Sequence, residues 1–216
     1  WVDYVSLFPE NTFNNRPNGL RRDVAEMLVG LKPAFFRWPG GCVVEGITLD
    51  NRFEWKKTLG DPAARPGEYS TWGYRCSYGF GYYEMLQFCE DIGAKAMFVC
   101  NVGLGCQFRM GDACGEHDID FYIDDCLDAI EYALGDESTE WGARRAADGH
   151  PAPFPLQYVE IGNENWGAEY DRRFDIFYKT IKEKYPQLTL IYNEMPQRDG
   201  ASQITKTDMI DPHWYV

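Results

Sequence analysis

One stretch of the sequence brings a carboxyl group, two amides and an indole ring together within four residues. Asn163, Glu164, Asn165 and Trp166 follow a short apolar run with the length of a buried strand. A carboxyl group that a Trp desolvates can keep its proton near neutral pH and give it to a leaving-group oxygen, while the Asn163 amide binds a substrate hydroxyl. The alternative is that Glu164 caps the helix that follows. We favour the catalytic interpretation and expect Trp166 to contact the substrate.

Three further residues have types and spacing suited to a binding pocket. Arg37 precedes a Pro-Gly-Gly segment, where a guanidinium can orient a carboxylate while the glycines let a ligand approach the backbone. An ordinary buried ion pair explains Arg37 equally well. His213 and Tyr215 are two residues apart, so in an extended chain both side chains point into one pocket. A core His and Tyr with satisfied hydrogen bonds is the alternative.

The spacing of other reactive residues does not support other kinds of site. His117 and His150 lack ligand-like spacing and the 7 cysteines contain no C-x-x-C pair, so we expect no metal and no cofactor. The dinucleotide fingerprint, the P-loop and the G-x-S-x-G elbow are all missing. Cys106 and Cys114 could form a disulfide in an exported protein. We leave the compartment open and favour an extracellular or periplasmic location.

Composition and charge exclude several classes of partner. The chain has 216 residues, 44% hydrophobic and 25% charged, which is typical of a globular domain. Its net charge of -13 repels phosphate backbones and anionic lipid surfaces. No run of 18 apolar residues is present. We therefore expect neither nucleic acid nor membrane as a partner, and the sequence leaves the oligomeric state open.

Hydrophobic periodicity predicts alternating helices and strands. Helical spacing of apolar residues is clearest in segments 20–31, 82–89, 119–134 and 174–185. Apolar runs of strand length are found at 34–38, 96–101, 158–162, 188–192 and 209–210. Near-continuous apolar strands separated by amphipathic helices are typical of a parallel sheet covered by helices. The predicted fold class is therefore α/β.

Polar clusters at the ends of these strands favour a (β/α)8 TIM barrel over a doubly wound sheet. Such a barrel assembles its site from many strand ends and the loops that follow them, which here include the long segments 39–80 and 102–117. A closed barrel needs eight strands, and we find five. Residues 1–7 look like part of another extended stretch. We therefore expect residues 1–216 to be one partial catalytic domain that is truncated at both ends.

Several segments in the same order resemble glycoside hydrolase family 51, the α-L-arabinofuranosidases. These segments are residues 6–9, 16–21, 37–42, 86–91 and 158–167. The resemblance implies a retaining mechanism on a (β/α)8 barrel, with the acid/base Glu after the fourth strand and the nucleophile Glu after the seventh. Glu164 matches the acid/base, and Asn163 matches the neighbour that contacts the sugar 2-hydroxyl. On this numbering the chain holds about strands 2 to 6.

The resemblance also suggests roles for the other candidates. Arg37 matches the arginine that helps to orient the nucleophile, and His213 with Tyr215 matches a His-x-Tyr pair around the sugar. Cys42 falls where some relatives carry a pocket Asn. The implied activity is the release of terminal α-L-arabinofuranosyl residues from arabinose-containing plant polysaccharides or oligosaccharides.

The same resemblance places the nucleophile beyond residue 216, so we expect an active parent protein and an inactive isolated fragment. Glu45 and Glu194 are the strand-end alternatives for the nucleophile, and we favour neither. Two other functions stay open. One is a related retaining barrel glycosidase that acts on another sugar, and the other is a carbohydrate-binding barrel without catalysis.

Overall fold

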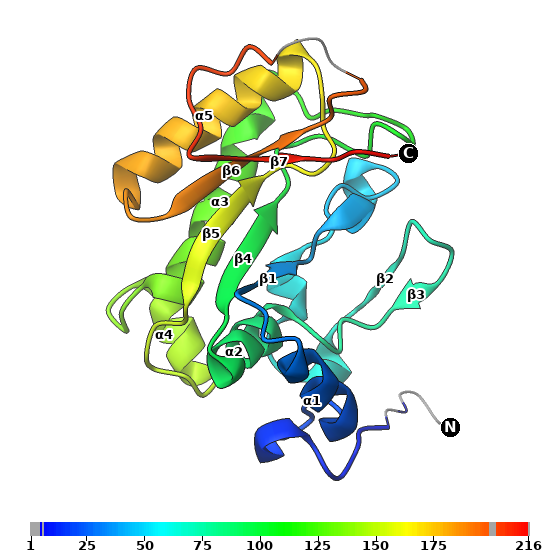
Figure 1. Ribbon diagram of the computed structural model, residues 1–216, viewed down its shortest axis with the longest axis vertical. Helices are drawn as coiled ribbons and strands as arrows, with labels where there is room; N and C mark the ends of the chain where they lie inside the picture. Colours follow the sequence, from blue (N-terminus) through cyan, green and yellow to red (C-terminus); the bar gives the residue numbers. More distant parts are fainter. Residues whose placement is uncertain (1–4, 6, 199–201, 216) are drawn as a thin grey trace.

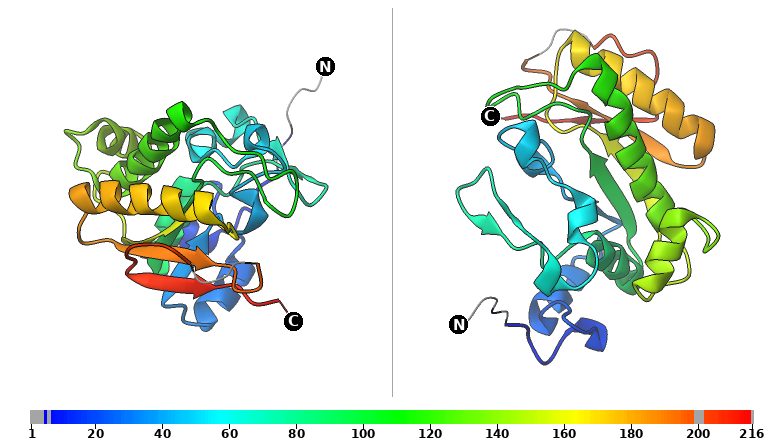
Figure 2. Two further views of the ribbon diagram at one scale, coloured as in Figure 1. Left: turned by 90° about the horizontal axis from the view of Figure 1, so that it is seen from above. Right: turned by 180° about the vertical axis from the view of Figure 1, so that it is seen from behind.

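The central feature is a parallel sheet of five strands. The computed structural model describes residues 5, 7–198 and 202–215. In spatial order the strands are β1 (Phe35–Trp38), β4 (Lys95–Cys100), β5 (Leu156–Ile161), β6 (Thr189–Glu194) and β7 (Met209–Pro212). Spatial order follows chain order, so every connection leads to the neighbouring strand. The sheet curls into a half-barrel that is open along β1 and β7 (Figures 1 and 2), which confirms the α/β class.

Helices cover one face of this sheet. The helices are α1 (Arg22–Gly30), α2 (Tyr82–Ile92), α3 (Ile119–Leu134), α4 (Glu140–Ala147) and α5 (Ala168–Lys184). Helices α2, α3 and α5 contact the strands, and α4 packs on α3. The view from behind in Figure 2 shows α3 and α5 in front of the sheet, whereas Figure 1 shows them behind it. The sheet therefore has one face that is covered by helices and an opposite face without helices.

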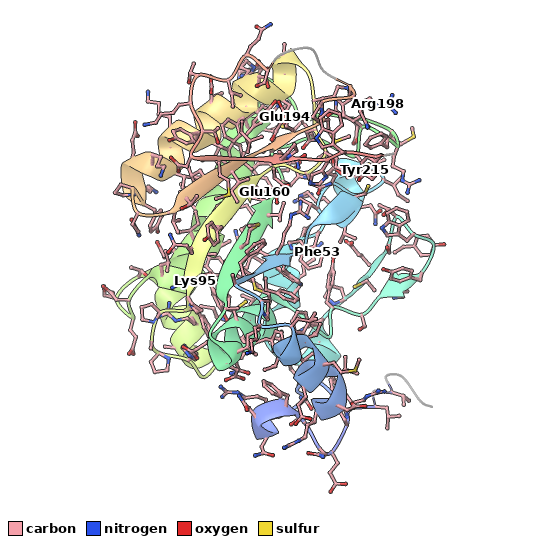
Figure 3. All side chains as sticks on the ribbon, viewed as in Figure 1. Phe53, Lys95, Glu160, Glu194, Arg198 and Tyr215 are labelled. Carbon is pink, nitrogen blue, oxygen red and sulfur yellow. The ribbon has the colours of Figure 1, made fainter. Side chains whose placement is uncertain are left out.

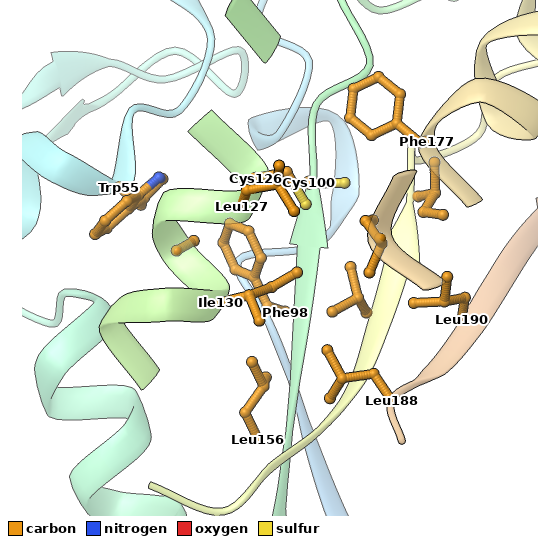
Figure 4. Close-up of a cluster of buried hydrophobic side chains, with 14 of the residues drawn as sticks. Trp55, Phe98, Cys100, Cys126, Leu127, Ile130, Leu156, Phe177, Leu188 and Leu190 are labelled. Atoms are coloured by element: carbon orange, nitrogen blue, oxygen red, sulfur yellow. The ribbon is translucent and has the colours of Figure 1, made fainter. Parts of the chain in front are cut away.

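The hydrophobic core lies between the sheet and its helices. Successive side chains of a strand point to opposite faces, so Phe98 and Cys100 of β4 point toward the helices. They pack against the stripe of α3 that carries Leu127 and Ile130 (Figure 4). Spacing of three and four residues along a helix produces such a stripe. The same alternation turns every second strand residue toward the face without helices.

The predicted elements are confirmed, and two strands and one helix were missed. All four helices and all five strands are present near their expected positions. Segment 39–80 was expected to be a loop but contains the antiparallel hairpin of β2 (Glu68–Tyr69) and β3 (Arg75–Cys76). Helix α4 was also missed because a charged side chain anchors it: the buried Arg145 donates to the carbonyl oxygens of Tyr132, His150 and Pro151.

The remaining short elements are 3-10 turns in the connections. They are Phe13–Asn15, Gly41–Val43, Leu49–Asn51, Trp55–Thr58, Pro62–Ala64 and Glu116–Asp118. None of the described helices is long and apolar enough to cross a bilayer.

Helix α1 leaves its apolar stripe exposed. Met27 and Leu31, which belong to the predicted helical pattern of segment 20–31, are 75% and 76% exposed. The described part of the chain therefore does not cover this stripe. The expectation that residues 1–7 are extended stays a prediction, because residues 1–4 and 6 lie outside the described residues; Val5 and Leu7 are assigned to no strand.

Candidate active site

The carboxyl ends of the five strands meet at one edge of the sheet and carry a cluster of polar side chains. On the face without helices, four strands each present one polar residue. These residues are Arg37 of β1, Glu160 of β5, Asn193 of β6 and Asp211 of β7. In Figure 3, Glu160 and Tyr215 lie toward this end of the sheet, and Lys95, the first residue of β4, lies toward the other end. Parallel pairing thus brings together polar residues that are far apart in sequence.

Glu164 lies in the centre of this cluster. Its side chain is almost buried, with 6% of the residue exposed. Oε1 accepts hydrogen bonds from the Tyr215 hydroxyl and from His213 Nδ1, the latter at 2.9 Å. Oε2 lies 3.9 Å from Cys42 Sγ. Helix α5 begins only at Ala168, so Glu164 does not cap it, and the helix-cap alternative is wrong.

The backbone at Glu164 has an uncommon conformation that neighbouring groups hold in place. Its φ is +50°, in the left-handed region that non-glycine residues rarely adopt. Its N–H donates to Asn193 Oδ1. At Gly162, with φ of +83°, a Cβ would lie 2.7 Å from Asn165 Oδ1 and 2.8 Å from Tyr170 Cε2. Strain of this kind often accompanies functional sites, because the surrounding structure must enforce it.

Glu45 holds the same loop from the opposite side, a role that the sequence did not reveal. Asn163 Nδ2 donates to one Glu45 oxygen at 3.3 Å, and Asn165 Nδ2 donates to the other at 2.8 Å. Glu45 is 1% exposed, and burial, together with the nearby Cys106, raises its pKa well above the usual range. A buried carboxyl group that positions two amides is poorly suited to be a nucleophile.

Arg37 forms the buried ion pair that was one of its two possible roles. Nε and Nη2 bind the two oxygens of Glu160 at 2.5 and 3.0 Å, and Nη2 also donates to Asn163 Oδ1 at 2.8 Å. Burial raises the pKa of Glu160, and the hydrogen bonds from Arg37 oppose that shift. A Cβ at Gly40 would lie 2.3 Å from Arg37 Nη1, so this glycine makes room for the guanidinium itself. Arg37 therefore orients Asn163.

His213 and Tyr215 point into one site, as the spacing predicts, because both contact Glu164. The second ring nitrogen of His213, Nε2, lies 3.2 Å from Asp211 Oδ2. Hydrogen bonds to Asp211 and then to Glu164 raise the pKa of His213 to about 9. The hydrogen bond from His213 correspondingly lowers the pKa of Asp211. At neutral pH a cationic imidazolium therefore donates to Glu164.

A hollow of about 320 Å³ opens beside Glu164. It is lined by Cys42, Trp72, Phe108, Arg109, Glu164, Gln197, Arg198 and Tyr215. Arg198 and Tyr215 lie close together at this end of the molecule in Figure 3. Trp72 and Phe108 are 61% and 40% exposed. These two aromatic residues come from the long loops and were not singled out from the sequence, although aromatic side chains in such loops often stack on flat ligands.

Trp166 supports this hollow without lining it. Its ring packs edge-on against Phe108 with centroids 5.0 Å apart, and the guanidinium of Arg198 lies 5.7 Å from its centroid. The Gln107 side chain accepts a hydrogen bond from the backbone N–H of Trp166 at 2.8 Å and donates one to the carbonyl oxygen of Trp166 at 3.0 Å. A direct contact between Trp166 and substrate stays a prediction.

The cysteines near the site do not pair as considered. None of the seven cysteines, all of which lie in the described residues, forms a disulfide. Cys106 lies beside Cys42 and Glu45, whereas Cys114 Sγ accepts a hydrogen bond from Arg173 Nη1 at 3.0 Å. The disulfide between Cys106 and Cys114, which the sequence left open, is therefore not formed.

Comparison with known proteins decides the family. A family model described as "Alpha-L-arabinofuranosidase 1 domain" matches residues 27–216. The chain belongs to this α-L-arabinofuranosidase family. Its curated relatives include an extracellular exo-α-L-arabinofuranosidase of Streptomyces chartreusis, 38% identical over 99% of this chain and 28% of the relative. α-L-Arabinofuranosidase 1 of Arabidopsis thaliana is 40% identical over 100% of this chain and 31% of its own length.

Solved structures of arabinofuranosidases share the fold. An arabinose-bound MgGH51 α-L-arabinofuranosidase superposes with a TM-score of 0.82 at 37% identity, over 89% of this chain and 31% of that one. An arabinose complex of the Thermotoga maritima enzyme gives 0.67 at 26% identity, over 82% of this chain and 34% of that one. The chain thus spans about a third of the length of the relatives that it matches.

Proposed function

We propose that the complete protein is a retaining α-L-arabinofuranosidase that releases terminal arabinofuranosyl residues from plant polysaccharides or oligosaccharides, with Glu164 as general acid/base. The observation that carries this proposal is the environment of the Glu164 carboxyl group. Tyr215 and His213 both bind Oε1, Oε2 lies 3.9 Å from Cys42 Sγ, and Glu164 lines the hollow. The family membership and the arabinose-bound relative support the choice of sugar.

The hydrogen bonds on Oε1 suit a proton donor. As Glu164 gives its proton from Oε2 to the glycosidic oxygen, its carboxyl group becomes a carboxylate. The imidazolium of His213 and the hydroxyl of Tyr215 then stabilise the new charge. In the second half of the reaction the carboxylate takes a proton from water. Arg37 and Glu45 hold the buried Asn163 amide, and the binding of a sugar hydroxyl by Asn163 is part of this proposal.

The second carboxylate of the retaining pair belongs, in this proposal, to a strand outside the 216-residue sequence. A retaining enzyme needs its two carboxyl groups about 5 to 5.5 Å apart. Glu45 is engaged by two amides, and Glu160 is bound by Arg37. Glu194 alternates with Asn193 along β6, so its side chain points to the helix-covered face. We also infer that the protein acts outside the cell, like the Streptomyces relative by its name.

Glu164→Gln in the complete protein tests whether Glu164 protonates the leaving group, because substrates with poor and good leaving groups should respond differently. Glutamine cannot donate the proton, so kcat/KM for an alkyl arabinofuranoside, which has a poor leaving group, should fall by about 10²- to 10⁴-fold. An aryl arabinofuranoside with a nitrophenolate leaving group needs little protonation and should lose much less. Glu183→Gln, at an exposed position of α5, is the control and should behave as wild type.

Other outcomes would identify the alternatives. Equal losses with both leaving groups would contradict the acid role of Glu164. Faster turnover of a xyloside or a β-glucoside by the wild-type protein would indicate a glycosidase for another sugar. If the wild-type protein binds arabinose without turnover, and Glu164→Gln leaves that affinity unchanged, the protein is a carbohydrate-binding barrel.

A further inference from the structure

Two thiols and a carboxyl group meet in a buried cluster behind Glu164. Cys42 Sγ, Cys106 Sγ and one carboxylate oxygen of Glu45 all lie within 4.8 Å of one another. The three residues are 7%, 0% and 1% exposed. Cys42 and Glu45 belong to the loop after β1, and Cys106 belongs to the loop after β4. The neighbouring strands β1 and β4 therefore bring this cluster together, and for this reason no local sequence motif predicts it.

This donor set matches the preferences of borderline and soft divalent cations. Thiolate sulfur selects Zn²⁺ and similar ions over Mg²⁺ and Ca²⁺. With Zn–S bonds of about 2.3 Å and Zn–O bonds of about 2.0 to 2.2 Å, tetrahedral ligand atoms lie roughly 3.3 to 3.8 Å apart. The cluster reaches that spacing with small side-chain adjustments. We propose that Cys42, Cys106 and Glu45 form a binding site for a single divalent cation of the Zn²⁺ and Cd²⁺ class.

The surroundings of the cluster provide the support and the access that such a site needs. The amides of Asn163 and Asn165 each hold one Glu45 oxygen and so fix the orientation of that ligand. Cys42 lines the hollow beside Glu164, which offers a path from solvent.

A second group of potential ligands nearby does not form such a site. Glu160, Asp211 and His213 also place their ligand atoms within 4.8 Å of one another. However, Arg37 Nε lies 2.5 Å from Glu160 and 4.0 Å from Asp211. The guanidinium already provides the positive charge that a metal ion would supply there.

A cation in the cluster would reach the candidate acid/base. Glu164 Oε2 lies 3.9 Å from Cys42 Sγ, close enough to become the fourth ligand after a small rotation. Oε2 could then no longer carry the proton that the glycosidic oxygen needs, so the cation would inhibit the enzyme. This consequence rests on the proposed function, whereas cation binding does not.

Titration with Cd²⁺ tests the binding directly, without any measurement of activity. The complete protein, kept reduced, should take up one Cd²⁺ per chain with the ultraviolet charge-transfer absorption of cadmium thiolates. Cys106→Ser should weaken this binding by about 10-fold or more and reduce the absorption. Cys89→Ser, which changes an equally buried thiol on α2, is the matched control and should keep both.

A measurement on the wild-type protein guards against a variant that fails to fold. Bound Cd²⁺ should slow the alkylation of Cys42 and leave that of Cys76, on β3, unchanged. The proposal is overturned if no thiolate absorption develops, if both serine variants bind equally, or if Cys42 alkylates at the same rate with Cd²⁺. Binding without loss of arabinofuranosidase activity would overturn only the link to Glu164.

Discussion

Replacing Arg37 with Met should strongly destabilise the half-barrel. The Glu160 side chain is 0% exposed, and Arg37 makes two hydrogen bonds to it at 2.5 and 3.0 Å. Removing the guanidinium leaves a buried carboxylate without its counter-charge, which typically costs about 3 to 5 kcal/mol. The Asn193 amide, which donates to Glu160 Oε1 at 3.1 Å, compensates for little of that charge.

Removing Arg37 and removing Glu160 should not reduce the free energy of unfolding by the same amount. The Arg37 side chain is 24% exposed, so water can solvate it when Glu160→Gln removes the carboxylate. Glu160→Gln should therefore cost less than Arg37→Met. The double variant removes both charges of this pair and keeps an acceptor for Asn193, so it should lie within about 2 kcal/mol of wild type. The Arg37→Met deficit should also shrink as the pH is lowered, because Glu160 can then take up a proton.

Urea unfolding of the complete protein, followed by tryptophan fluorescence, measures these differences. Arg21→Met is the control, because Arg21 and its partner Asp23 have side chains 66% and 68% exposed, and the midpoint should not move. The reasoning is refuted if Arg37→Met costs less than about 1 kcal/mol, the range of a surface pair. It is also refuted if the double variant is no more stable than Arg37→Met.

Two further predictions concern the charge state of the site and the chain on its own. His213 should titrate near pH 9 in NMR spectra assigned with His213→Asn, and Asp211→Asn should lower that pKa, because the Asp211 hydrogen bond is the largest cause of the shift. The stability that His213 gains from these contacts should be fully present below pH 6.5 and should be lost as the pH rises through about 9. A His213 signal that titrates near 6.5 would contradict this. The 216-residue chain alone should aggregate and not hydrolyse an aryl arabinofuranoside, because in the described residues β1 and β7 each leave one edge of the sheet unpaired, and because the proposed mechanism places the second carboxylate outside this chain. A soluble, cooperatively unfolding or active chain would contradict that expectation.

Local sequence patterns were sufficient for the five strands of the parallel sheet, for four of the five helices and for the edge of the sheet where the site forms. Apolar residues at helical spacing predicted α3 and α5, and apolar runs predicted the five strands. Glu164, His213 and Tyr215 were predicted from their positions at strand ends, and the structure brings them into contact. Helix α4 was not predictable in this way, because hydrogen bonds from the buried Arg145 anchor it.

The sequence by itself determined which residues lie at the active edge, because strand length, period and turn residues are local properties. Only the tertiary structure decided how they pair. Glu160 was not singled out, yet it binds Arg37, and Glu45 holds the Asn163 and Asn165 amides. The proximity of Cys42 to Cys106 could likewise not be predicted from the sequence. These contacts join side chains from separate loops and strands, and their distances depend on how the sheet curls and how each loop returns to it, which no local period encodes.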